Sequence, residues 1–193
     1  HMYSLQPENQ ATYNFKATPW GGACVIPQYI ESFDPDDQRL KDDFISGPQY
    51  DKNGGVLYCT MGNMKGKPLD YVNKVNSIDD SDENQGWRWG KFEYAEGITN
   101  RLSNDFPLLR YADVYLMKAE ALLRTGHADV AAELVTKVRE RNFTEHPAKA
   151  IVTGEQLQET SCYDYGRRDN VKSTHDHAII QYGRMLDELG WEF

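Results

Sequence analysis

The stretch DFPLLRYADVYLMKAEALLRTGHADVAAELVTKVRER, residues 105–141, carries the clearest folding signal in the chain. Its first part predicts a helix that begins after Pro107, because apolar side chains recur there at spacings of three and four: Leu109, Ala112, Leu116, Ala119 and Leu123. Gly126 ends this helix, and a second helix over residues 128–141 repeats the period with Ala131, Leu134, Val135 and Val138. Two apolar stripes that face each other predict a helical hairpin.

The hairpin has some features of a tetratricopeptide unit. Ala119 and Ala131 are small residues on opposite arms, and Leu122 and Val135 occupy offsets that such a repeat uses for large packing residues. The aromatic positions of the repeat are not filled by aromatic residues. A plain helical hairpin within a larger core is therefore an equal alternative to a true repeat.

The amino-acid sequence of this stretch also resembles a family signature. Residues 106–122, FPLLRYADVYLMKAEAL, followed by Gly126, Ala131 and the VRER of residues 138–141, closely resemble the signature of the SusD/RagB family. The resemblance implies a surface lipoprotein of the starch-binding SusD type, which captures nutrients, usually glycans, for an outer-membrane transporter.

Further segments extend the resemblance along the chain. The motifs PWGG (19–22), PQYI (27–30) and FDPDDQRL (33–40) resemble the family's Asp-rich turn and its approach, KFE (91–93) resembles a strand-like lead into the hairpin, and residues 182–193 resemble a late helix. The resemblance implies a mainly α fold, an incomplete SusD-like α-α superhelix. Because members of the family are far longer, we expect a carboxy-terminal fragment that lacks both ends.

The pattern along the chain predicts three segments of one domain. Residues 1–104 hold most of the glycines and only short apolar runs, at 24–26 and 55–60, which predicts long irregular loops with a few short strands. The hairpin occupies 105–141. Residues 142–193 are expected to form a connecting loop and a closing helix, with Ala178, Tyr182, Met185 or Leu186, and Leu189 on one face and Gly190 at its end.

Composition excludes several classes of protein. The net charge of -9 argues against nucleic acid as a partner, since phosphate neutralisation needs clustered Lys and Arg. The sequence contains no run of about 18 apolar residues, so no membrane-spanning helix is predicted. Location at the cell surface on the outer membrane is implied by the resemblance alone, through a lipid anchor outside this sequence, and the fragment itself is expected to be soluble.

No metal or cofactor is expected from the sequence. Cys24, Cys59 and Cys162 are scattered and odd in number, so they predict free thiols, buried for the most part. The pair His175 and His177 lacks a further ligand at a suitable spacing.

Three polar motifs are interpreted as structural. Residues 80–91 depart from a calcium loop at the turn glycine and at the twelfth position, which favours a solvated acidic loop. Residues 62–68 lack the spacing and the Ser or Thr of a phosphate loop. Asp34, Asp36 and Asp37 are adjacent carboxylates on one turn, and we expect them to cap the next helix and to pair with Arg39.

Aromatic residues of the first segment are the candidates for ligand binding. Sugar rings stack on exposed Trp or Tyr, while polar side chains bind the surrounding hydroxyls. Two groups combine these features: Tyr13, Asn14, Trp20 and Tyr29 near Gly21 and Gly22, and Trp87, Arg88 and Trp89. Each aromatic residue has burial in the core as its alternative. Trp20, between Pro19 and two glycines, is predicted to present its ring to solvent.

These observations favour non-catalytic capture of an oligosaccharide at the cell surface and its delivery to a SusC-like TonB-dependent transporter. No catalytic residue is predicted. One alternative is a purely structural helical-repeat segment that contacts the transporter or the remaining part of the protein. A weaker alternative is a fragment of a glycoside hydrolase.

Overall fold

The computed structural model describes residues 3–77, 79–99, 105, 107–164 and 179–193. These residues form two compact units. Unit 1 contains the described residues of 3–31 and 40–99, and unit 2 contains those of 32–39, 105–164 and 179–193. The fold is mainly helical, as predicted. The predicted grouping of three segments into one domain stays a prediction.

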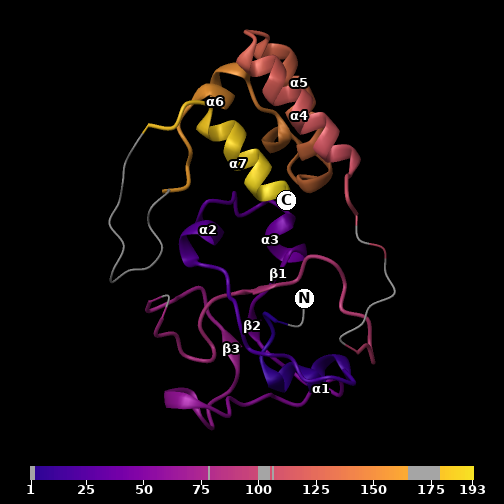
Figure 1. Cartoon of the computed structure of the whole chain (residues 1–193), viewed down its shortest axis with the longest axis vertical. Helices are drawn as coiled ribbons and strands as arrows, with labels where there is room; N and C mark the ends of the chain where they lie inside the picture. Colours follow the sequence, from indigo (N-terminus) through magenta and orange to yellow (C-terminus); the bar gives the residue numbers. More distant parts are fainter. Residues whose placement is uncertain (1–2, 78, 100–104, 106, 165–178) are drawn as a thin grey trace. The chain divides into compact units, whose positions relative to one another are not determined.

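Unit 2 is built around the predicted helical hairpin, formed by α4 (Tyr111–Arg124) and α5 (Ala128–Arg139), which lie side by side in Figure 1. Gly126 turns the chain with a φ of 86°, in the left-handed region that favours glycine. The hairpin core consists of the small and branched residues that face the other arm: Ala112, Leu116, Ala119, Leu123, Ala131, Ala132, Val135 and Val138. The hairpin prediction is confirmed.

The start of α4 differs from the prediction. Arg110 is extended, and its N–H donates to Asp113 Oδ2 at 2.6 Å, so the first helical turn begins at Tyr111. Leu109 therefore lies before the helix and is exposed, and its predicted place on the buried stripe is wrong.

Short helices complete unit 2: η3 (Glu140–Asn142), η4 (Pro147–Ala150), α6 (Gly154–Gln158) and α7 (Gly183–Glu192). The prediction that Gly190 ends the closing helix is wrong. Trp191 and Glu192 are both buried, and α7 continues through Gly190 to place them. Ala178, at the start of the predicted face, lies outside the described residues.

An ion pair fixes the acidic turn of unit 2. Arg39 donates to Asp37 through Nε and Nη2, with a shortest distance of 2.6 Å, and the side chains are 6% and 2% exposed. The Arg39 backbone N–H also donates to Asp37 Oδ1 at 3.0 Å, at the first residue of α3 (Arg39–Asp42). Asp34 accepts the N–H of Asp36 at 2.9 Å. The predicted capping and pairing by this turn are confirmed.

Glu192 joins four segments of unit 2. Its carboxylate forms ion pairs with Arg39 at 3.5 Å, with Arg110 at 3.1 Å and with Arg141. Close by, Arg139 pairs with Glu188 at 2.6 Å. Buried charges are tolerated only when they are paired, and here each carboxylate has at least one guanidinium partner.

Unit 1 consists mainly of irregular chain held by short elements. Its helices are η1 (Pro7–Asn9), α1 (Gln10–Tyr13), α2 (Pro27–Glu31), the part of α3 that follows Arg39, and η2 (Gly62–Met64). Its strands pair antiparallel as β1 (Phe44–Ile45) with β4 (Arg88–Trp89) and β2 (Gly47–Pro48) with β3 (Asp70–Tyr71).

The predicted loops with short strands are present in unit 1, although the strands differ in place. The apolar runs 24–26 and 55–60 form only isolated bridges, such as Val25 to Trp87 and Tyr58 to Pro68. The strand-like lead expected at 91–93 is absent, because β4 ends at Trp89 and Phe92 has a φ of 68°.

A buried polar network ties the segments of unit 1 together. The Tyr71 hydroxyl accepts the N–H of Gln6 at 3.0 Å and donates to Asn9 Oδ1 at 2.5 Å. Asn9 Nδ2 then donates to Gln49 Oε1 at 3.1 Å. Burial raises the pKa of Tyr71 to about 12, so this hydroxyl keeps its proton for the network. Small apolar clusters around Phe15 and Leu69 lie beside it.

Candidate binding site

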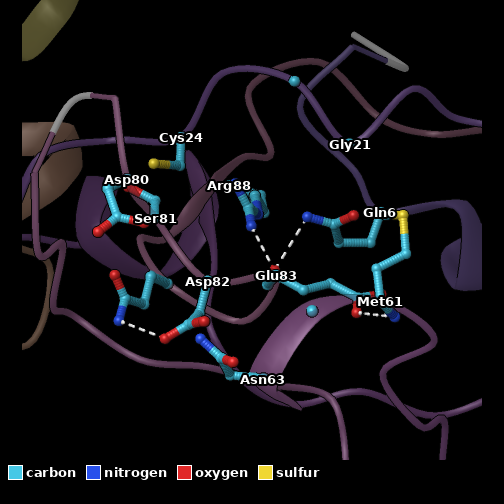
Figure 2. A pocket seen from close by; sticks show the side chains of 13 residues that line it. Gln6, Gly21, Cys24, Met61, Asn63, Asp80, Ser81, Asp82, Glu83 and Arg88 are labelled. Carbon is cyan, nitrogen blue, oxygen red and sulfur yellow. Dashed lines mark hydrogen bonds between the residues drawn. The ribbon is translucent and has the colours of Figure 1, made fainter. Parts of the chain in front are cut away.

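A cavity of about 360 Å³ opens in unit 1. Four separate stretches of chain line it, as Figure 2 shows: Gln6; Gly21, Gly22 and Cys24; Met61, Gly62 and Asn63; and Asp80, Ser81, Asp82, Glu83, Gln85 and Arg88. The lining is dominated by carboxylates, amides and backbone groups. Such a surface suits a ligand with many hydroxyl groups.

Two glycines allow the close approach that shapes one wall. Gly21 N–H donates to Leu5 O at 2.8 Å, and Gly22 N–H donates to Tyr3 O at 2.6 Å. A Cβ on Gly21 would lie 2.5 Å from Gln6 Oε1, and one on Gly22 would lie 2.8 Å from Tyr3 O. Both distances are too short for real atoms. A side chain at Gly22 would collide with backbone, whereas one at Gly21 would displace the end of the Gln6 side chain and strain a backbone whose φ is 65°.

Trp20, which immediately precedes this wall, presents its ring to solvent. The residue is 71% exposed, and its ring meets the edge of Tyr3 at a centroid distance of 4.6 Å and an angle of 71°. The predicted exposure is confirmed. Its predicted contact with a sugar stays a prediction.

Glu83 organises the acidic wall of the cavity. Its backbone carbonyl accepts from Gln6 Nε2 at 2.9 Å and from Arg88 Nη2 at 2.8 Å. Its carboxylate accepts the N–H groups of Thr60 at 3.2 Å and Met61 at 2.9 Å. Burial, reinforced by Glu8, raises the pKa of Glu83. Glu83 therefore connects the stretch that contains Met61 to the one that contains Arg88.

Two buried polar atoms of the lining lack a hydrogen-bond partner among the described residues. They are Gln6 Oε1, on a residue 4% exposed, and Arg88 Nε, on a residue 2% exposed. An unpaired buried polar group costs about 1–3 kcal/mol. A ligand or a water that paired with these atoms would recover part of that cost.

The seven predicted site residues do not form one site. Besides Trp20, already described, they lie in the cavity lining, at the end of α1 and around Phe44. Arg88 lines the cavity but is buried, with its guanidinium 4.7 Å from the Tyr71 ring centroid. Tyr13 stacks on Phe15 with a centroid distance of 5.0 Å and an angle of 14°. Asn14 ends α1 in the left-handed conformation, with its amide 3.4 Å from Glu96.

The remaining three predicted residues pack around one ring, that of Phe44. Its centroid lies 6.1 Å from Tyr29, 6.4 Å from Trp87 and 5.4 Å from Trp89. Tyr29 and Trp87 are half-buried in this cluster, and Trp89 is exposed on one side. None of the three is part of the described lining of the cavity.

Comparison with known proteins gives the family. The sequence matches the SusD family over residues 1–161. The chain belongs to the SusD family. Comparisons with curated proteins and with solved structures gave no match. Proteins of the SusD family serve glycan-binding nutrient uptake, are generally non-catalytic, work with SusC-like transporters and are associated with the outer membrane.

Several residues at the cavity of this SusD-family chain were not singled out from the sequence as binding residues, among them Gln6, Asn63, Asp80 and Asp82. A signal for some of them was present. The stretch 80–91 was interpreted as a solvated acidic loop and a phosphate loop was rejected at 62–68, and the two stretches meet at the cavity. Asp80 is exposed as predicted, whereas residues 83–85 are buried.

The cysteines of the SusD-family chain are free. Only Cys59 is buried, and burial, with Glu83 and Glu8, raises its pKa to about 11. Burial of the thiol and the nearby Asp187 raise the pKa of Cys162 to about 12, although the residue as a whole is exposed. Cys24 is half-buried in the cavity wall, so the prediction of buried thiols is wrong for Cys24 and Cys162.

Within the described residues, no group of three or more His, Cys, Asp and Glu could hold a metal ion. His175 and His177 lie outside the described residues. Among the helices that the structure describes, none combines the length and apolar character needed to cross a bilayer.

Proposed function

We propose that this SusD-family chain captures an oligosaccharide at the cell surface without altering it chemically, and that the saccharide passes to a SusC-like TonB-dependent transporter. One observation carries the proposal. The exposed ring of Trp20, supported at its edge by Tyr3, directly precedes two glycines that line a polar cavity. An aromatic platform beside clustered carboxylates and amides is the combination that a sugar ring requires.

The proposal assigns different roles to the residues. Trp20 stacks on the apolar face of one sugar ring, and the cavity lining binds the hydroxyl groups of that ring or the next. Gln6 offers an acceptor that has no partner in the described structure. Binding needs no proton transfer, so the site requires neither a nucleophile nor a catalytic acid.

Calorimetry with a glycan found on a glycan array tests the platform. We expect Trp20→Ala to weaken binding by about 1–3 kcal/mol, the range of interface hot spots, with little change in stability because the ring is exposed. Trp89→Ala is the matched control. It removes an indole that packs against Phe44, so it should lower stability and leave affinity within about twofold.

Three outcomes would contradict the proposal. Affinity unchanged by Trp20→Ala would remove the platform from the site. Failure of the protein to bind any glycan would favour the structural helical-repeat alternative. Release of reducing sugar from the bound glycan would favour a hydrolase. A reading frame for a SusC-like transporter beside the coding sequence is the expected genomic observation.

A further inference from the structure

We propose that the cavity ranks saccharides by charge. A cationic amino sugar binds most tightly, a neutral sugar less tightly, and an acidic sugar least. The inference rests on the proposed glycan-binding function and adds the chemical class of the preferred ligand.

The first observation is the sign of the side chains that face the cavity. Asp80 is exposed and Asp82 half-buried, and both line the cavity from a single stretch of chain that also supplies Glu83 (Figure 2). The described lining contains no lysine and a single arginine. Like charges in one recess repel an anion, and a recess of low dielectric strengthens the effect.

The single arginine offsets only part of this negative charge, because three carboxylates line the same cavity. Arg88 is 2% exposed, its Nη2 donates to the Glu83 carbonyl at 2.8 Å, and its guanidinium lies over the Tyr71 ring at 4.7 Å. Its Nη2 is therefore already engaged and its unpaired Nε is buried, which leaves no open fork for a carboxylate or sulfate, the groups that arginine usually binds in acidic sugars.

The second observation concerns hydrogen-bond acceptors. Gln6 is 4% exposed and lines the cavity, and its Oε1 has no partner among the described residues. Asp82 Oδ2 accepts only a long bond of 3.3 Å from Gln85 Nε2 in the described contacts. An ammonium group supplies three donors and no acceptor, so it pairs with such a surface better than a hydroxyl does.

Coulomb's law gives the size of the preference. One unit charge about 6 Å from another, at an effective dielectric of about 40 to 80, changes affinity by about threefold to tenfold. We expect one such step between amino and neutral sugars and another between neutral and acidic sugars. Added salt should weaken binding of the amino sugar and leave the affinity for the neutral sugar unchanged.

The test uses a glycan array that holds glucosamine, glucose and glucuronic acid oligomers in several linkages, followed by calorimetry on the best-bound linkage in all three forms. The expected order is amine, neutral, acid. An acidic form that binds as well as the amine overturns this inference and leaves the proposed function intact. Absence of binding to every glycan, by contrast, overturns the proposed function and this inference with it.

Variants assign the ranking to the cavity. Asp82→Asn and Asp80→Asn should each reduce the ratio of amine to neutral affinity, by as much as about tenfold. Asp42→Asn removes the same charge from an exposed position outside the cavity and should leave the ratio unchanged. Circular dichroism spectra of the three variants check that they are folded. A ratio that neither cavity variant changes would overturn the inference.

Discussion

Removing Arg39 should destabilise unit 2 more than any change to a surface ion pair. Arg39→Met leaves the Asp37 carboxylate, 2% exposed, without the guanidinium that lies 2.6 Å away. Burial opposes the charge on Arg39, but the hydrogen bonds and charge of Asp37 outweigh it and raise the pKa of Arg39. Breaking one partner of such a buried pair costs about 3–5 kcal/mol.

The other ion pairs of Glu192 limit how much more Arg39→Met lowers the free energy of unfolding. Glu192 keeps Arg110 and Arg141 after Arg39 is lost, so its own charge stays compensated. The cost therefore comes almost entirely from Asp37. Replacing both partners, as Asp37→Leu with Arg39→Met, removes the orphaned charge and should cost less than Arg39→Met alone.

Urea unfolding followed by far-ultraviolet circular dichroism measures the loss, because α4, α5 and α7 all belong to unit 2. Arg124→Gln is the matched control. Its ion pair with Glu120 is almost as short, at 2.7 Å, but the side chains are 55% and 32% exposed. Even with its contact to the Tyr182 ring, it should cost less than about 1 kcal/mol. Equal losses for Arg39→Met and Arg124→Gln would refute the reasoning.

Three further predictions concern the hairpin, the acidic turn and the cavity. Ala119→Leu should overpack the fully buried contact between α4 and α5 and cost about 1–3 kcal/mol, whereas the exposed Glu133→Gln should leave the melting temperature almost unchanged. Burial opposes ionisation of Asp34, but the hydrogen bond from Lys149 outweighs it and lowers the pKa of Asp34. The resulting stabilisation is present above the unfolded-state pKa and is lost as pH falls through the folded-state pKa, so the stability difference between the parent and Lys149→Met should narrow below about pH 4 in thermal melts. Because the pKa values of Cys59 and Cys162 are raised, an alkylating reagent near neutral pH should modify Cys24 before either of them, and a bound glycan should protect Cys24. Mass spectrometry that found equal labelling of Cys24 with and without glycan would count against the cavity as the binding site.

Local sequence patterns predicted the parts of the fold that local interactions determine. The hairpin follows from apolar spacing and from a glycine that readily adopts a positive φ, and neither requires a distant contact. The exposure of Trp20 was predicted in the same way, from Pro19 and the two glycines around it. The Asp37 to Arg39 pair spans only two residues, which is why the turn could be interpreted correctly.

Contacts between distant residues determined what the sequence did not predict. The helix α7 passes through Gly190 because Trp191 and Glu192 are buried against residues far away in the chain, including Ser32, which accepts from the Trp191 indole at 3.0 Å. The cavity likewise depends on Gln6 meeting Glu83, a separation of 77 positions. No local pattern in the acid-rich stretch or in the glycine-rich stretch predicts that the two meet at one cavity.

The division of unit 2 along the chain has a consequence for the order of events during synthesis. Residues 32–39 leave the ribosome well before their partners on α7, and the bond between Ser32 and Trp191 spans 159 positions. Closing so long a loop is entropically costly, and early formation of unit 1 would shorten the free chain within it. The segment 32–39 can therefore contact residues 142–149 earlier, but it gains its contacts with Trp191 and Glu192 only when α7 is complete. We expect pulse-labelled hydrogen exchange to find unit 1 protected first.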